Sequence, residues 1–253
     1  MILFLLPPSE TKRDGGAQRT RLGLTRLSHR SLTGQRTLVL DRLAEVCGDG
    51  DAAARALKLS ARAAPAELER NRRIRISPTL PAIERYTGVL FDALGVSDWD
   101  DAARERAAQH VAIQSALFGL IGAGDAIPAY RLSHDSRLPG LRLAAHWADP
   151  TRAILAGHRG PILDLRSEAY AALGPAPARD DSLFVRVVTV GEDGVSRALS
   201  HANKAGKGRF LRAMLTEGPL PPTLDAFIDH AASLGWTLRP GAHGELELVV
   251  DHP

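Results

Sequence analysis

Apolar runs alternate with helical patterns along the chain, and together they predict an α/β fold. The runs at residues 2–6, 111–117, 162–165 and 183–190 are short, aliphatic and bounded by glycine, proline or polar residues, as buried strands are. Their density indicates that helices cover them on both faces. We therefore expect a mixed central sheet surrounded by helices, in a single compact domain over residues 1–253.

Helical spacing of apolar residues fills the intervals between the strands. Pro81 suits a first helical position and Gly95 suits a stop, while Asp49 or Asp51 and Ser97 or Asp98 suit helix caps. The expected helices cover residues 34–47, 51–59, 65–73, 81–94, 98–109, 150–157, the stretch after Ser167, 203–216 and 224–234. Asp193-Gly194 predicts a hairpin turn, and residues 236–238 and 246–250 predict a closing pair of strands.

The stretch from Val111 to Trp147 combines a predicted strand, several glycines and a polar, aromatic loop. The strand runs into Gly119, Gly122 and Gly124, which predicts that it delivers a loop. Binding residues concentrate on loops held by a rigid strand. An ordinary surface loop is the alternative.

Composition narrows the class of protein. The chain has 253 residues, of which 44% are hydrophobic and 24% are charged, as in ordinary globular proteins. Its single cysteine, Cys47, excludes an internal disulfide framework and a multi-cysteine metal site, and fits a reducing compartment. The run at residues 2–6 is shorter than a signal-peptide core, and no run reaches the roughly 20 apolar residues of a membrane span. We expect a cytoplasmic protein without a membrane partner.

Positive charge gathers in two places although the net charge is only +3. Residues 12–36 hold seven cations and one acid, and residues 197–212 hold five cations and no acid. Such stretches could converge on phosphates, although each could equally be a solvated surface. On a helical wheel, Lys204 and Lys207 project on the apolar side of their helix. The alternative is that the helix starts only after Gly206 and Gly208 and leaves both lysines in a loop. The candidates for contact with nucleic acid are Arg19, Arg21, Arg26, Lys207, Arg209 and Arg212.

Lysine is rare in this chain, which draws attention to the places where it occurs. Only four of the 32 basic residues are lysines, and three of them, Lys12, Lys204 and Lys207, lie in the two basic stretches. The pKa of a compact ammonium group moves readily on burial, so lysine is not interchangeable with arginine. These positions are therefore candidates for a role that needs a lysine.

Familiar catalytic and cofactor motifs do not occur. The sequence has no GxxxxGK[ST] loop, no GxGxxG between a strand and a helix, and no HExxH, and its nine histidines are scattered singly. We predict neither a metal nor a cofactor. Gly122-Ala123-Gly124 faintly resembles the hairpin of helix-hairpin-helix DNA-binding elements, but Pro128 argues against a regular second helix.

The order of several unusual stretches is more specific than any one motif. Along residues 1–216 the chain reads LLPPSETK, ALKLS, AELERNRRI, PAIERYTGVLFDAL, SALFGLIGAGDAIPAYRL, LRLAAHW, ILDLRSEAY and HANKAGKGRFLRAML. This succession resembles the YaaA peroxide-stress family. Residues 217–253 look variable, and Val89 departs from the acidic residue that often follows the family glycine.

The resemblance implies a compact α/β fold peculiar to the family, a cytosolic location, and protection from hydrogen peroxide by limiting reactive iron. It also implies binding to duplex or distorted DNA. The positions that match the family motifs are Lys12, Tyr86, Gly88, Tyr130, Arg131, Ser167, Glu168, Tyr170, Lys204, Gly208 and Arg212.

Two functions stay open. A DNA-associated stress protein would bind duplexes without reading their sequence, and its affinity would fall with salt. An enzyme would gather a pocket for a small anionic ligand, with candidates Lys12, Tyr130, Arg131, Ser167, Glu168, Tyr170 and Lys204. A structural alternative pairs Glu168 with Arg131 as a buried scaffold. The sequence favours the binding protein over the enzyme.

Overall fold

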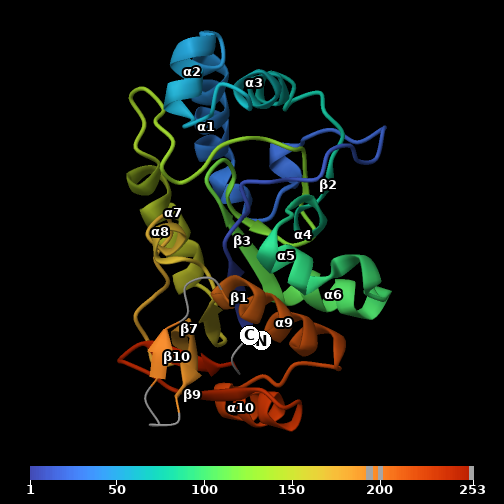
Figure 1. Cartoon of the computed structure of the whole chain (residues 1–253), viewed down its shortest axis with the longest axis vertical. Coiled ribbons are helices and arrows are strands. Elements are labelled where there is room, and N and C mark those ends of the chain that lie inside the picture. Colours follow the sequence, from blue (N-terminus) through green and yellow to red (C-terminus); the bar gives the residue numbers. More distant parts are fainter. Residues whose placement is uncertain (192–195, 199–201, 251–253) are drawn as a thin grey trace.

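The sheet is built around β1 (Leu3–Leu6), the apolar run at the start of the chain. The computed structural model describes residues 1–191, 196–198 and 202–250. β1 pairs in parallel with β3 (Val111–Ser115) on one side and with β6 (Ile162–Asp164) on the other. β6 in turn pairs in parallel with β7 (Ser182–Val190). The four predicted strands thus share one sheet, which confirms the expected mixed α/β architecture (Figure 1).

Antiparallel strands border this parallel centre. β4 (Gly119–Gly122) pairs with β3 at one end, and β9 (Thr237–Pro240) pairs with β10 (Glu245–Val249) at the other. β10 lies parallel to β7, and the order is β4-β3-β1-β6-β7-β10-β9. β8 (Ser196–Ala198) also pairs with β7, while the predicted turn at Asp193-Gly194 lies outside the described residues. β2 (Leu80–Pro81) and β5 (Ala126–Ile127) form a separate small sheet.

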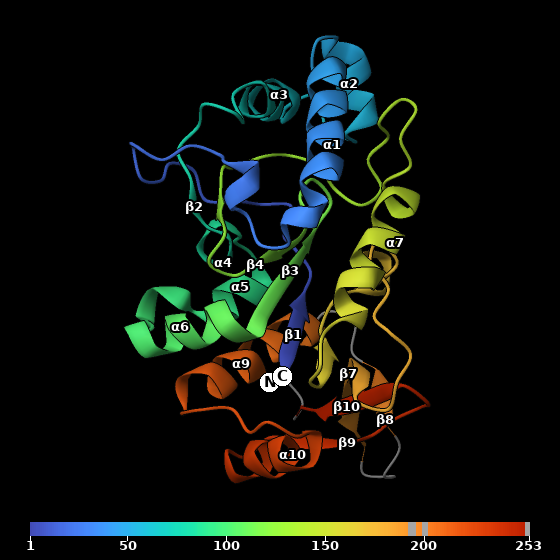
Figure 2. The ribbon, with the colours of Figure 1, turned by 180° about the vertical axis from the view of Figure 1, so that it is seen from behind.

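Helices cover both faces of the sheet, as the dense apolar strands require. On one face the ring of Phe4 lies 5.7 Å from that of Phe227 in α10 (Leu224–Ser233), which also meets Phe210 of α9 (Ala202–Thr216). On the other face, Trp147 of α7 (Leu143–Ala156) donates its indole N–H to the Ala116 carbonyl. Figure 2 shows α7 and the pair α9 and α10 on different sides of β1.

The remaining helices agree with most of the sequence patterns. They are α1 (Thr33–Val46), α2 (Gly50–Ala56), α3 (Ala64–Arg72), α4 (Ala82–Arg85), α5 (Val89–Leu94), α6 (Asp101–His110) and α8 (Glu168–Ala171). Asp49 caps α2, because its carboxylate accepts from the Ala52 amide. The cap of α6 is Asp100, whereas the sequence pattern suggested Ser97 or Asp98.

Three local predictions were wrong. The single helix expected over residues 81–94 is two short helices, because Gly88 adopts a φ of 95° that ends helical geometry between them. The helix expected from Pro150 begins at Leu143, so packing of the apolar face of α7 overrides the proline. The glycine-rich loop after β3 forms β4 instead, with Gly119 at a φ of 65° in the turn.

Arg36 fastens this β3–β4 hairpin to the start of α1. Its side chain is fully buried, and its guanidinium donates to the carbonyl oxygens of Phe118 and Leu120 at 2.8 Å each. It donates as well to the carbonyl of Ser28, in the loop before α1, at 2.7 Å. A buried carbonyl without a hydrogen-bond donor is unfavourable. The guanidinium of Arg36 therefore supplies donors to several main-chain carbonyls at once.

We predict that Arg36→Met lowers the free energy of unfolding by about 3–5 kcal/mol, because it leaves several buried carbonyls without donors. Urea unfolding followed by circular dichroism measures the change. Arg42→Met is the matched control on the same helix, since Arg42 makes an exposed ion pair with Glu45. Removal of such a pair changes stability by less than about 1 kcal/mol. Equal effects of the two variants would contradict the role of Arg36.

Candidate functional site

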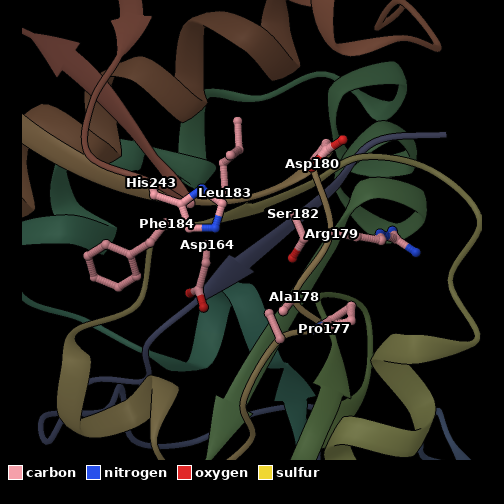
Figure 3. A pocket seen from close by; sticks show the side chains of 11 residues that line it. Asp164, Pro177, Ala178, Arg179, Asp180, Ser182, Leu183, Phe184 and His243 are labelled. Carbon is pink, nitrogen blue, oxygen red and sulfur yellow. The ribbon is translucent and has the colours of Figure 1, made fainter.

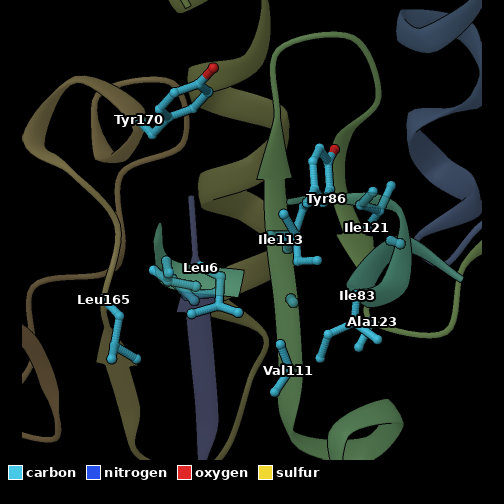
Figure 4. Close-up of a cluster of buried hydrophobic side chains, with 14 of the residues drawn as sticks. Leu6, Ile83, Tyr86, Val111, Ile113, Ile121, Ala123, Leu165 and Tyr170 are labelled. Carbon is cyan, nitrogen blue, oxygen red and sulfur yellow. The ribbon is translucent and has the colours of Figure 1, made fainter. Parts of the chain in front are cut away.

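The candidate site around Lys12 lies at the carboxyl ends of β1 and β6, the two central strands of the sheet. In the strand order, β1 is followed by β3 toward one edge of the sheet, whereas β6 is followed by β7 toward the other edge. The loops after β1 and β6 are therefore drawn apart at their carboxyl ends, which is where open α/β sheets place ligands. Figure 4 shows Leu6 and Leu165 at these two strand ends, with Tyr86 and Tyr170 beyond them.

Lys12 comes from the loop after β1 and is folded inward. The residue is only 8% exposed, and a bridge to Tyr86 ties its backbone to the segment after α4. Its Nζ donates to the carbonyls of Ser9 at 2.9 Å and Glu10 at 3.2 Å. The same nitrogen lies 4.1 Å from the centre of the Tyr130 ring and 5.4 Å from that of Tyr86. Lys12 is thus enclosed by two tyrosine rings and its own loop.

The two tyrosines belong to a buried chain of hydroxyl groups. Tyr86 Oη and Tyr130 Oη are 2.8 Å apart, and Tyr130 Oη is 2.7 Å from Ser115 Oγ at the end of β3. Ser115 Oγ also accepts from the amides of Leu117 and Phe118, which orients it within the turn to β4. Burial raises the pKa of Tyr86 and of Tyr130, so both hydroxyls stay protonated at neutral pH.

Charged side chains surround Lys12 in pairs. Arg131 Nη2 lies 2.8 Å from the Glu10 carboxylate. Arg70 on α3 pairs with Glu67 at 2.6 Å and with Asp14 at 2.8 Å. Burial, with smaller contributions from Arg131 and Arg70, lowers the pKa of Lys12 to about 7 against the opposing effects of Glu67 and Glu10. A substantial share of Lys12 is therefore a neutral amine at physiological pH.

Tyr170 brings the loop after β6 to the same cluster. Its ring lies 5.1 Å from the ring of His134. Burial raises the pKa of Tyr170, and proximity to Tyr130 and Glu10 raises it further. The structure thus brings together four of the predicted pocket residues, namely Lys12, Tyr130, Arg131 and Tyr170.

The other three predicted pocket residues lie elsewhere. Ser167 sits at the start of α8, where its side chain makes no capping hydrogen bond. Glu168 is exposed and reaches Arg186 of β7 at 3.5 Å. The alternative pairing of Glu168 with Arg131 is wrong, since the partner of Arg131 is Glu10. Lys204 is exposed on α9.

Lys207 is the lysine of α9 that turns inward. It is 4% exposed, and its Nζ lies 3.4 Å from the Arg166 carbonyl and 5.1 Å from the centre of the Phe184 ring. Burial lowers the pKa of Lys207 to about 8, an effect that Asp164 opposes and Arg186 reinforces. Its burial removes Lys207 from the set that can contact DNA phosphates at the surface. The helical-wheel prediction of an apolar-side position fits Lys207 but is wrong for Lys204.

Sequence reasoning missed the buried ion pair at the end of β6. Arg166 is fully buried and binds both carboxylate oxygens of Asp164, at 2.8 and 2.6 Å, and the carbonyl of Gly174 at 2.8 Å. The signal was present as Asp-Leu-Arg within ILDLRSEAY, where two charges flank an apolar strand end. Asp164 also borders a cavity of about 540 Å³, lined in addition by Phe184, Arg179 and His243 (Figure 3).

Two of the glycines that match the family motifs, Gly88 and Gly208, have structural roles. Gly88 supplies the positive φ between α4 and α5. Gly208 lets α9 approach α5, because a Cβ there would lie 2.3 Å from the Leu90 carbonyl oxygen. Gly122, by contrast, ends β4, and its carbonyl accepts from the Asp125 amide at 3.1 Å, so residues 122–125 form a β-turn and not a helical hairpin.

Comparison with known proteins identifies the family of this chain. The family model of peroxide stress protein YaaA matches residues 2–231, a span that contains Lys12, Tyr130, Arg131 and Tyr170. The chain belongs to the YaaA peroxide stress protein family. A UPF0246 protein of Corynebacterium efficiens is 39% identical over 98% of this chain and 100% of its own length. A UPF0246 protein of Streptomyces coelicolor is 38% identical over 95% of this chain and 93% of its own.

More distant relatives cover a smaller part of the chain. A UPF0246 protein of Lactobacillus delbrueckii is 28% identical over 68% of this chain and 70% of its own length. Membership of the YaaA family supports a role in the response to oxidative stress. Within the described residues, no helix is long and apolar enough to span a membrane, and no group of three or more His, Cys, Asp or Glu side chains could hold a metal ion.

The buried amine predicts how stability depends on pH. The pKa of Lys12 is about 7 in the folded protein and 10.5 in an exposed lysine, so between these values the unfolded chain binds more protons. Stability should therefore rise with pH across this window, by up to about 1.4 kcal/mol per pH unit from this one group. Lys12→Met should flatten the rise. Urea unfolding of both proteins between about pH 7 and pH 9 measures the difference, and parallel curves would contradict it.

Proposed function

We propose that this protein acts in the peroxide response by binding duplex DNA without reading its sequence. The observation that carries the proposal is an exposed, arginine-rich loop between β1 and α1. Its exposed arginines are Arg13, Arg19, Arg21, Arg26 and Arg30. Arginines spread along a surface loop suit contact with phosphates, which gives affinity without sequence specificity.

The charge of this loop is little offset by acids. Its two acids are already paired with arginines outside the loop, Glu10 with Arg131 and Asp14 with Arg70 of α3. In Figures 1 and 2 the loop appears as the blue segment that projects from the edge of the molecule near β2. A projecting loop of this kind is accessible to a polyanion as large as a duplex.

Hydrogen bonds with a buried arginine and a half-buried aspartate hold the loop in place at its two ends. The guanidinium of Arg85, which is fully buried, donates to the carbonyls of Arg13 and Gly15. At the far end the Asp125 carboxylate accepts from the Ser28 amide at 2.9 Å. A loop fixed before binding loses less conformational entropy when it meets a ligand, so these anchors favour a binding role.

Arg209 and Arg212 form a second set of DNA candidates on α9. Arg209 is exposed, whereas the guanidinium of Arg212 lies 3.2 Å from the Asp98 carboxylate. Both views place α9 in the lower half of the molecule and the arginine-rich loop in the upper half. We therefore assign the primary contact to the loop, and α9 would take part only if the duplex extended along the long axis.

The test is a titration of fluorescent duplexes of unrelated sequence across about 50 to 200 mM salt. We expect similar affinity for each duplex and a steep loss of affinity with salt. The double substitution Arg19→Gln with Arg21→Gln should lower affinity for all duplexes alike and reduce the log–log salt slope by about two. Absence of binding at low salt would rule out the proposal.

Arg209→Gln with Arg212→Gln is the matched comparison, because it removes the same charge from the other half of the molecule. A slope reduced only in the loop variant supports the loop as the interface. A slope reduced only in the α9 variant would move the interface to that helix. Limitation of reactive iron, which the family resemblance implies, is proposed here only as the context in which DNA is bound.

A second candidate function is binding of a small anionic ligand for an enzymatic reaction at the Lys12 site. The observation that favours it is the convergence of Lys12, Arg131 and Tyr130 at the carboxyl ends of the central strands. A buried amine with a lowered pKa is one of the ways in which proteins prepare a nucleophile or a base.

A further inference from the structure

Lys12 and Arg131 meet at one residue, Glu10. The carbonyl oxygen of Glu10 accepts from Lys12 Nζ at 3.2 Å, and its carboxylate lies 2.8 Å from Arg131 Nη2. The Glu10 side chain is 60% exposed, whereas that of Arg131 is 15% exposed. A carboxylate from the solvent side thus covers a guanidinium that is otherwise mostly enclosed by protein.

Polar atoms near this pair are left without partners. Among the described residues, Arg131 Nε and Glu67 Oε2 are buried and make no hydrogen bond. Buried polar atoms are nearly always hydrogen-bonded in native proteins, so unmatched ones indicate a missing polar partner. The unmatched donor is the Nε–H of the Arg131 guanidinium, and because a guanidinium is positively charged, an anion would be a fitting acceptor.

The environment of Lys12 favours the neutral form of its amine. The ionisable groups that face it are Glu10 on its own loop, Glu67 and Arg70 on α3, Tyr86 after α4, and Tyr130 and Arg131 after β5. Burial and the two arginines oppose a further positive charge, and they lower the pKa of the amine to about 7. A neutral primary amine attacks carbonyl carbon, whereas an ammonium group does not.

We propose that Lys12 condenses with the carbonyl carbon of a small oxo acid whose carboxylate replaces that of Glu10 on Arg131. The Nζ lone pair forms the new C–N bond while the carbonyl π electrons move to oxygen. The resulting carbinolamine loses that oxygen as water, together with the two protons of the amine, and a C=N bond forms. This inference deepens the second candidate function and is independent of DNA binding.

The test is reductive trapping on the full chain. Glyoxylate is the probe because it is the smallest oxo acid, and cyanoborohydride reduces the imine to a carboxymethyl group on the lysine. Peptide mass mapping then compares Lys12 with Lys58, a half-exposed lysine paired with Asp135. At pH 7 an ordinary lysine is almost wholly protonated, so we expect Lys12 to be labelled roughly tenfold faster or more.

Two variants separate the binding of the carboxylate by Arg131 from the reactivity of the Lys12 amine. Glu10→Gln removes the competing carboxylate and should speed labelling of Lys12 roughly two- to fivefold, the equivalent of one exposed ion pair. Arg131→Gln should slow it by at least as much. Acetaldehyde, which has no carboxylate, measures the change in amine reactivity that each substitution causes through the pKa of Lys12. The ratio of glyoxylate labelling to acetaldehyde labelling should therefore rise in Glu10→Gln and fall in Arg131→Gln. The exposed position of Glu10 makes its substitution compatible with folding even if Arg131→Gln destabilises the chain.

The results separate imine formation at Lys12 from anion binding at Arg131. Labelling of Lys58 without labelling of Lys12 overturns the imine. If glyoxylate still raises the melting temperature of the wild type and not of Arg131→Gln, then anion binding at the site survives as the second candidate function. If neither labelling nor a thermal shift occurs, both fail. Labelling of Lys12 that ignores Glu10→Gln and Arg131→Gln overturns the assignment of Arg131 as the anchor.

Discussion

Buried guanidinium groups that collect main-chain carbonyls hold this fold together where regular hydrogen bonding stops. Arg36, Arg85 and Arg166 are all fully buried, and each reaches carbonyl oxygens in segments far from it or outside strands. A guanidinium offers five donors in a fixed plane, so one side chain can satisfy several carbonyls at once. The long loops around the sheet depend on these hydrogen bonds from buried arginines, because the main-chain groups of a buried loop otherwise lack partners.

These anchors decide what the loop after β1 can do. Arg85 holds the carbonyls of Arg13 and Gly15 from the inside, and the arginines of the loop are exposed at the surface. One residue earlier, Lys12 is directed inward between two tyrosine rings. A single segment therefore presents an exposed cationic surface and a buried amine, and the two proposed functions use different parts of it.

Charge within the site follows from the same packing. The carboxylates of Glu10, Glu67 and Asp14 pair with Arg131 and Arg70, whereas the described contacts of Lys12 Nζ are carbonyls and aromatic rings. Neutral acceptors compensate a buried charge less well than a carboxylate does, so the pKa of Lys12 lies below that of an exposed lysine. Lys207 shows the same effect beside the end of β6, where the carboxylate of Asp164 is already committed to Arg166.

The amino-acid sequence by itself determined the strands, most of the helices and the family. Dense apolar runs located β1, β3, β6 and β7, since burial on both faces leaves a signal within a few residues. The order of motifs placed Lys12, Tyr130, Arg131 and Tyr170 near strand ends. Only the tertiary structure decided that Glu10 pairs with Arg131, that Lys207 turns inward while Lys204 does not, and that the glycine-rich stretch is β4. Those outcomes depend on which faces of distant elements meet. Local sequence patterns record the periodicity of one element and carry no information about the contacts that the element makes with another.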